Sequence, residues 1–236
     1  MSDYTGVANL EAMEAAVNYN EFLCGLAEAF VLPGTKVLDF GAGTGWLAAR
    51  IAARGCDIVC VEPDERLRVI VLAKNLATVP SITAVPSSSV DFVYSFNVLE
   101  HIADDAEALG ELHRVLVPGG KLLLYVPAFM LLFSAMDRLV GHYRRYNRAA
   151  LTQAAARAGF IVEDSRYADS LGFAASMALK LAGSQSGVLN ARAVRLYDRW
   201  VFPLSRLLDR AMSPVLGKNL ILKARRPYSR RAPRAV

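Results

Sequence analysis

An α/β fold with a seven-stranded, mostly parallel sheet and helices on both faces is what this sequence predicts, and two observations support it. Short apolar runs alternate with amphipathic segments along much of the 236-residue chain. This order is typical of consecutive βαβ units, whose strands are parallel. Several runs, such as KLLLYV at 121–126, are almost continuously apolar, which indicates strands buried on both faces.

The apolar runs place the strands. They are expected at 36–40, 57–61, 81–85, 91–96, 121–126, 160–163 and 220–224. Between them, apolar residues recur at helical spacing, and Gly or Pro follows the end of several of these segments. We therefore expect helices at 9–30, 46–54, 65–76, 106–116 and 148–158.

Two segments, residues 127–147 and 170–217, interrupt this alternation, and we expect them to form a helical cap together. In the second, apolar residues from Leu189 to Ala211 follow helical spacing with one interruption at Pro203, and arginines occupy the opposite face. These are Arg192, Arg195, Arg199, Arg206 and Arg210. The predicted organisation is a core with an N-terminal helix (1–126), a cap insertion (127–147), a core continuation (148–169), a helical insertion (170–217), the last strand (218–225) and a disordered basic tail (226–236).

Composition excludes several protein classes. Hydrophobic residues make up 54% of the chain and charged residues 21%, which excludes a disordered chain. Three cysteines are too few for a disulfide scaffold, and we expect Cys56 and Cys60 to be buried reduced thiols rather than a metal clip. The N-terminus lacks the pattern of a signal peptide, and no apolar run is long enough to cross a bilayer. We therefore expect a cytoplasmic protein.

Charge is distributed unevenly along the chain. Residues 1–125 carry 8 Lys or Arg against 16 Asp or Glu, whereas residues 126–236 carry 19 against 6. The basic half indicates either a solvated tail or an anionic partner, such as a phosphate-bearing substrate or the inner, acidic surface of a membrane. Its aromatic residues follow helical spacing rather than a base-stacking pattern, so we expect no nucleic-acid partner.

A glycine-rich turn carries the clearest functional pattern. In VLDFGAGTG, Gly41, Gly43 and Gly45 follow a predicted strand and precede a predicted helix. Glycines there let a ligand approach the backbone, and the helix N-terminus beyond offers free N–H donors. Glu62 ends the next strand, 21 residues after Gly41, where a carboxylate can accept hydrogen bonds from ribose hydroxyls. This pattern predicts a nucleotide-like ligand.

The spacing of these glycines distinguishes two cofactors. A dinucleotide fingerprint G-x-G-x-x-G needs Gly at the position of Trp46, whereas the G-x-G-x-G found here resembles motif I of class I S-adenosylmethionine (SAM)-dependent methyltransferases. Three later segments, VCVEPDE, VDFVYSFNVLEHI and LHRVLVPGGKLLLYVP, also resemble that family. The resemblance covers about residues 33–128, and residues 140–173 resemble bacterial members with largely unassigned substrates. It implies a Rossmann-like fold and SAM as cofactor.

The resemblance also implies roles for individual residues. The cofactor would contact Asp39, Gly41, Ala42, Gly43, Thr44, Gly45, Glu62, Pro63, Asn97, Val98 and Leu99, with Tyr19 closing over it from the N-terminal helix. An acidic residue often precedes the fourth strand in this family, but this chain has AVPSSS there. One of Ser87–Ser89, or a backbone carbonyl, would then have to contact the adenine.

Histidine is the commonest general base, and three histidines are present. His101 and His142 are the candidate catalytic bases, Glu100 could orient either, and His113 is expected to be structural. No cluster has the spacing of a metal site along the sequence, so we expect no metal.

The segment GHYRRYN is the candidate acceptor site. Tyr143, Arg144, Arg145 and Tyr146 could bind an anionic group, or the arginines could instead form salt bridges with the acidic half. The preceding apolar run FMLLFSAM would suit a small or lipid-like acceptor. Two alternatives to methyl transfer stay open at this point: a catalytically inactive SAM-binding or membrane-surface scaffold, and a nicotinamide-dependent oxidoreductase, which Trp46 disfavours.

Overall fold

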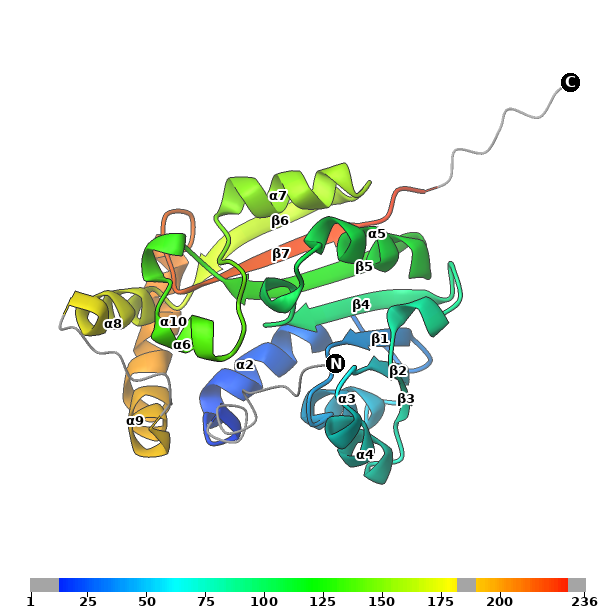
Figure 1. Ribbon diagram of the computed structural model, residues 1–236, viewed down its shortest axis with the longest axis horizontal. Coiled ribbons are helices and arrows are strands. Elements are labelled where there is room, and N and C mark those ends of the chain that lie inside the picture. The colour runs from blue at the N-terminus through cyan, green and yellow to red at the C-terminus, as the bar shows by residue number, and fades with distance from the viewer. Residues whose placement is uncertain (1–12, 182–189, 229–236) are drawn as a thin grey trace, which may run out of the picture.

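A single seven-stranded sheet organises the computed structural model, which describes residues 13–181 and 190–228 (Figure 1). Its strands are β1 (Lys36–Phe40), β2 (Asp57–Val61), β3 (Ala77–Val79), β4 (Val90–Phe96), β5 (Leu116–Pro127), β6 (Ile161–Ala168) and β7 (Asn219–Arg225). The spatial order is β3-β2-β1-β4-β5-β7-β6, and β7 alone runs antiparallel to its neighbours. The predicted fold class is therefore confirmed.

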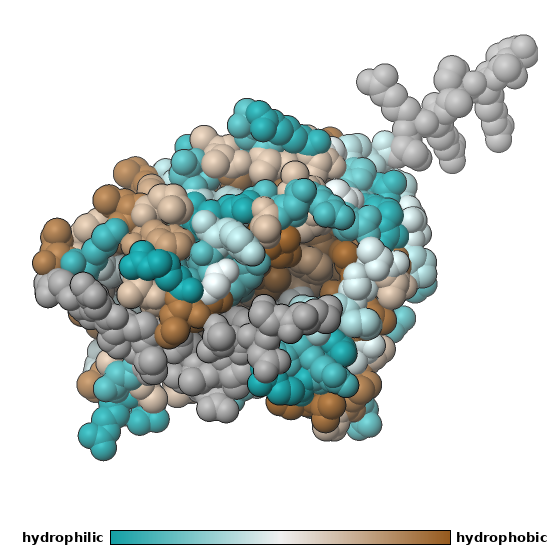
Figure 2. All heavy atoms as spheres, in the orientation of Figure 1, coloured by the Kyte–Doolittle hydropathy of each residue, from teal (hydrophilic) through white to brown (hydrophobic). Residues whose placement is uncertain are grey.

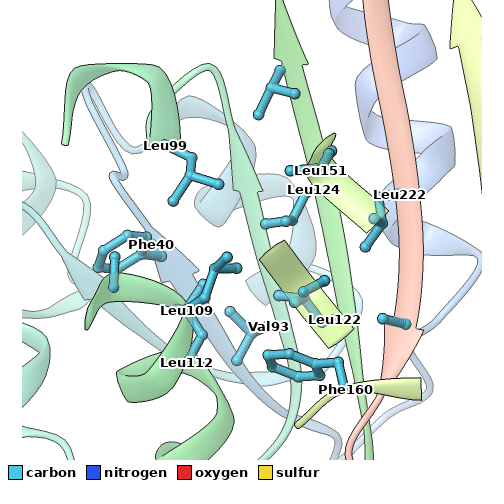
Figure 3. Packing of buried hydrophobic residues seen from close by; sticks show 14 of the residues in the cluster. Phe40, Val93, Leu99, Leu109, Leu112, Leu122, Leu124, Leu151, Phe160 and Leu222 are labelled. Atoms are coloured by element: carbon cyan, nitrogen blue, oxygen red, sulfur yellow. The ribbon is translucent and has the colours of Figure 1, made fainter. Parts of the chain in front are cut away.

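Alternation of side chains along the strands fills both faces of the sheet. Leu122 and Leu124 of β5 join a buried cluster with α5 (Asp105–Val115) and α7 (Arg148–Arg157), and Figure 3 shows this packing around Leu109 and Leu151. Tyr125 points to the other face, where α2 (Val17–Glu28), α3 (Trp46–Ala52) and α4 (Glu65–Ala73) contribute apolar residues. This two-sided burial is the reason the strands are almost continuously apolar.

The two predicted insertions lie together as one cap at the carboxyl ends of β4 and β5, at the left in Figure 1. The first contains η3 (Met130–Leu132) and α6 (Ala135–Leu139), and the second contains α8 (Ser170–Leu181), α9 (Ala191–Leu196), a π-helical turn η4 (Tyr197–Val201) and α10 (Phe202–Met212). Lys180 Nζ joins them by donating to the carbonyls of Leu131 (2.6 Å) and Phe133 (3.1 Å).

Pro203 lies in the first turn of α10, directly after the π-helical turn, and has no N–H to donate to that preceding turn. The chain before it widens into the π-helical turn, which turns Asp198 inward. The Asp198 carboxylate accepts hydrogen bonds from the backbone N–H groups of Asn18 (2.9 Å) and Tyr19 (2.8 Å). A negative charge at the start of α2 complements the helix dipole, so this contact attaches the cap to α2.

The predicted third strand is wrong. β3 lies earlier, at Ala77–Val79, and the predicted position holds a 3₁₀ turn, η1 (Ile82–Ala84). The Ser81 hydroxyl accepts from the N–H of Thr83 (3.3 Å), a local bond that favours a turn over a strand. Ile82 and Val85 are apolar because they pack into the core from this turn, not because they form a strand.

The ends of the chain differ from the predictions in two places. The N-terminal helix α2 begins at Val17, and residues 9–12 of the predicted helix lie outside the described residues. At the start of the predicted tail, the N–H of Arg226 donates to Gly120 O (2.9 Å), and the Arg225 guanidinium lies over the Tyr228 ring. Residues 229–236 of that tail lie outside the described residues.

Candidate functional site

A cavity of about 1450 Å³ opens at the carboxyl ends of β1, β2 and β4, between the sheet and the cap. Open parallel sheets bind their ligands at this edge. Small-molecule sites usually measure about 300–1,000 Å³, so this cavity has room for two molecules side by side. Its walls come from the glycine-rich loop, the carboxyl ends of four strands, α2, α4 and both parts of the cap.

The glycine-rich loop needs its glycines for backbone reasons. Gly41, Gly43 and Gly45 all have positive φ angles, of 87°, 56° and 71°. A Cβ atom on Gly41 would lie 2.3 Å from Cγ2 of Val98, which leaves no room for any side chain. A Cβ on Gly45 would meet Val71 at 3.1 Å, so this glycine packs against α4 instead of lining the cavity.

Glu62 fixes the loop to the end of β2. Its Oε2 accepts from the N–H of Gly43 (2.8 Å), and its Oε1 accepts from the N–H of Asp64 (2.9 Å). Burial raises the pKa of Glu62, and the two backbone hydrogen bonds oppose that rise. Each carboxylate oxygen keeps a second lone pair, and Glu62 lines the cavity, so it can also accept from a ligand hydroxyl.

Asp39 lies beneath the same loop and is almost completely buried. Its carboxylate accepts a hydrogen bond from the Tyr94 hydroxyl (2.7 Å). Burial raises the pKa of Asp39 to about 7, although the Tyr94 hydrogen bond acts in the opposite direction. A cationic ligand group beside it would favour its ionised form.

Asn97 and Tyr19 form a further part of the cavity wall. The amide of Asn97 donates to the Tyr19 hydroxyl (3.1 Å), and the Tyr19 ring lies edge-on to Phe202 with ring centroids 5.6 Å apart. Burial raises the pKa of Tyr19 to about 12, so the phenol stays neutral. Tyr19 thus joins the core to the cap beside the cavity.

Ten of the twelve predicted cofactor residues line the cavity, including Ala42, Thr44, Pro63 and Val98. Gly45 and Leu99 do not, and Figure 3 shows Leu99 packed in the core. Ser87–Ser89, predicted together with a backbone carbonyl as alternatives for the adenine contact, are not among the residues that line this cavity. Ser89 lines a small groove with Lys36 at the amino ends of the strands, the opposite edge of the sheet, because these serines precede β4.

A histidine pair lies where β4 meets the cap. His101, from the 3₁₀ turn η2 (Leu99–His101), and His142 have ring centroids 4.4 Å apart, and both line the cavity. Burial and the neighbouring His142 lower the pKa of His101 to about 4. His142 Nδ1 lies 2.8 Å from Oδ1 of Asp137, which orients its ring.

Glu100 lies beside this pair and is completely buried. Burial raises its pKa to about 8, and neither carboxylate oxygen has a hydrogen-bond partner. Glu100, His101 and His142 each offer a ligand atom, and these atoms lie within 4.8 Å of one another, so together they could hold a metal ion. Spacing along the sequence did not indicate this cluster, because His142 comes from the cap insertion.

Comparison with known proteins gives the family. Residues 16–165 match the family model described as a methyltransferase domain. The chain belongs to the class I SAM-dependent methyltransferases.

Individual relatives agree with this assignment. A protein of Mycolicibacterium smegmatis named a probable S-adenosylmethionine-dependent methyltransferase is 35% identical over 143 residues, which cover 56% of this chain and 54% of that protein. An uncharacterized methyltransferase of Mycolicibacterium gilvum is 32% identical over 197 residues, or 80% of this chain and 75% of the relative. The chain thus spans about half the length of the M. smegmatis relative.

The fold is also found among solved structures. A chain in the complex between the Haloferax volcanii Trm112 methyltransferase activator and a methyltransferase superposes with a TM-score of 0.68 and 16% identity. The match covers 97% of this chain and all of that one. At this identity the similarity concerns the fold alone.

The predicted anion clamp of this methyltransferase differs from expectation. Both arginines are paired within the chain: Arg145 donates through Nε and Nη2 to the buried Asp137 (2.8 and 3.0 Å), and Arg144 pairs with Asp105 (2.8 Å). Tyr146 donates to Asp105 as well (2.7 Å), and neither Arg144 nor Tyr146 lines the cavity. Only Tyr143 and Arg145 of the predicted four line it.

Lys218 is a cavity residue that sequence analysis missed. It precedes β7, lines the cavity, and makes no ion pair with the carboxylates of the described residues. Burial lowers its pKa. The apolar run NLILKA that follows Lys218 predicts a strand, but no sequence motif indicates a role for the lysine itself.

Proposed function

We propose that the protein transfers a methyl group from SAM to a small, amphiphilic acceptor bound beneath the cap. The observation that carries this proposal is the buried Glu62 carboxylate, which is bonded to the glycine-rich loop and faces a cavity large enough for two molecules. The family assignment supports the reaction class.

The residues present fit the cofactor. Glu62 has lone pairs for ribose hydroxyls beside Pro63, and Gly41 and Gly43 present backbone without side chains to the same cavity. Asp39 and Asn97 line the adjoining part of the cavity, where a carboxylate and an amide suit the amino acid end of the cofactor. When bound, SAM supplies a methyl group on a positively charged sulfur.

The remaining task of the chain is to align the acceptor and to exclude water. Tyr19 closes the wall between core and cap through its bond with Asn97 and its contact with Phe202. The cluster of Glu100, His101 and His142 faces the cavity at the end of β4 and is the group we assign to the proton of an acceptor hydroxyl or amine. His101 is neutral near pH 7, given its lowered pKa of about 4.

The lining of the cap supports an amphiphilic acceptor. Met136, Val140 and Leu179 contribute apolar surface to the cavity, while Tyr143 and Lys218 contribute polar groups. Because Asp137 neutralises Arg145, we assign the contact with an anionic group of the acceptor to Lys218. The predicted Arg144–Arg145 clamp is therefore replaced by a single cation.

The outer face of the cap suggests where such an acceptor comes from. Trp200, Leu204 and Leu207 form a stripe at i, i+4 and i+7 and are each more than half exposed. Arg199 lies over the Trp200 ring, and the same helical segment carries exposed Arg210. In Figure 2 hydrophobic side chains also gather at the left edge, where Figure 1 places α8. Apolar residues flanked by arginines suit an interfacial helix on an anionic membrane.

We therefore propose peripheral contact of the cap with a membrane surface. Within residues 13–181 and 190–228, no helix combines the length and the apolar character that a bilayer span requires.

Calorimetric titration with SAM, S-adenosylhomocysteine and NAD(H) tests the cofactor. We expect both sulfur compounds to bind, NAD(H) not to bind, and Glu62→Gln to weaken SAM binding at least tenfold. Glu107→Gln, a change at an exposed position in the first turn of α5, is the matched control and should bind as the wild type does. Absence of SAM binding by the folded wild type would remove the proposal.

A further inference from the structure

We propose that Glu100, His101 and His142 form a binding site for a divalent transition-metal ion at the wall of the cavity. The proposal concerns a metal site that neither the family nor the relatives assign. Its catalytic use rests on the proposed methyl transfer, whereas metal binding itself does not.

The three side chains place their ligand atoms slightly farther apart than they would be around a bound ion. Their ligand atoms lie within 4.8 Å of one another, and Oε1 of Glu100 lies 3.8 Å from Nε2 of His142. Two ligand atoms that share a zinc-sized ion at about 2.1 Å each are roughly 3 to 3.5 Å apart. Small rotations of the side chains would close the remaining gap.

The burial of Glu100 is a second, independent observation in favour of a bound cation. Its side chain is completely buried and lines the cavity, yet neither carboxylate oxygen accepts a hydrogen bond. A buried carboxylate without partners is strongly unfavourable, and its distance from His142 is too long for a hydrogen bond. A bound cation would satisfy both oxygens at once.

The surroundings orient the ligands as in known metal sites. Nδ1 of His142 lies 2.8 Å from Asp137, which leaves Nε2 directed toward Glu100. Metal-binding histidines commonly use their second nitrogen in this way, with a carboxylate that fixes the ring. Asp137 is in turn held by Arg145 and by the Ser134 hydroxyl (2.8 Å).

Local charge is compatible with a cation. The Asp137 carboxylate offsets the guanidinium of Arg145, Glu100 supplies a negative charge once the ion displaces its proton, and the histidines supply neutral nitrogen ligands when unprotonated. Two imidazoles and one carboxylate favour Zn²⁺, Mn²⁺, Fe²⁺ or Co²⁺ over Mg²⁺ and Ca²⁺, which prefer oxygen ligands. Three protein ligands beside an open cavity leave positions for a further ligand, as in catalytic metal sites.

This site changes the role of the histidines. As ligands they would direct their lone pairs to the ion and would not act as general bases. A cation at this wall lowers the pKa of an acceptor hydroxyl bound to it, and the released proton passes to solvent.

The test measures metal binding by the full chain, prepared without an affinity tag that binds metals and stripped with a chelator. Co²⁺ is titrated while its visible absorption is recorded, and Zn²⁺ content after dialysis is measured by mass spectrometry. We expect one ion per chain in the wild type and at least tenfold weaker binding in Glu100→Gln and in His142→Gln. His113→Gln, at a partly exposed histidine beside Phe160, is the matched control and should bind metal as the wild type does.

Circular dichroism and SAM titration accompany each variant. A folded Glu100→Gln variant that binds SAM normally but has lost Co²⁺ supports the site. Failure of SAM binding with Co²⁺ binding intact would remove the proposed function and leave the metal site standing. A folded wild type that takes up no stoichiometric Co²⁺ or Zn²⁺, or variants that bind Co²⁺ as tightly as the wild type, would overturn the metal site.

Discussion

Replacing Gly41 by alanine is the sharpest test of how the glycine-rich loop is built. Gly41 has a φ of 87°, and an added Cβ would lie 2.3 Å from Cγ2 and 2.7 Å from Cγ1 of Val98. The left-handed backbone costs an L-residue about 1–2 kcal/mol, and overpacking in a fixed site adds about 1–3 kcal/mol. We therefore expect Gly41→Ala to lower the free energy of unfolding by about 2–5 kcal/mol.

Gly43→Ala provides the matched comparison. Gly43 also has a positive φ, of 56°, but no atom lies within 4 Å of an added Cβ, so only the backbone cost of about 1–2 kcal/mol applies. The double variant Gly41→Ala/Val98→Ala removes the clashing methyl groups and should recover part of the loss. Urea unfolding followed by circular dichroism measures all three.

Equal losses for Gly41→Ala and Gly43→Ala, or no recovery in the double variant, would refute the steric explanation. SAM titration of the same variants separates stability from binding. Because Val98 lines the cavity beside the loop, displacement of its side chain should also weaken SAM binding in Gly41→Ala.

Four further predictions follow from individual contacts. Burial raises the folded-state pKa of Asp39 to about 7, so the wild type should lose stability relative to Asp39→Asn as the pH rises from about 4 to about 7. Urea unfolding of both proteins across that range measures this, and a pH-independent difference in their free energies of unfolding would contradict it. Asp198→Asn should lower the free energy of unfolding by about 1–2 kcal/mol and increase hydrogen exchange at the start of α2, because it removes the charge that caps that helix. Lys218→Met should raise KM for an anionic acceptor without changing the SAM dissociation constant, and an unchanged KM would exclude the lysine as the anion contact. Trp200→Ala combined with Leu204→Asp should reduce co-sedimentation with phosphatidylglycerol vesicles while leaving SAM binding intact, whereas equal binding to phosphatidylcholine vesicles would exclude an electrostatic contribution.

Sequence patterns predicted the fold well and selected residues that line the cavity, because both depend on contacts that are close along the chain or repeat with a period. The run KLLLYV in β5 is apolar on both faces, which by itself indicates a strand buried on both sides. The loop from Gly41 to Gly45 needs glycine because of its own backbone angles. The position of Glu62 at the edge of the sheet could be predicted because it comes directly after the strand β2. The third strand was misplaced because a short apolar segment packs into the core equally well from a 3₁₀ turn.

Only the tertiary structure decided which polar side chains face the cavity beneath the cap. The sequence left open whether Arg144 and Arg145 bind an anion or form salt bridges, and the structure pairs them with the carboxylates of Asp105 and Asp137. Glu100 and His142 are far apart in sequence and meet because the first insertion folds back over the end of β4. Asp198 reaches the start of α2 across 180 residues in the same way. Such contacts depend on how the cap packs on the sheet, and local periodicity contains no information about that packing.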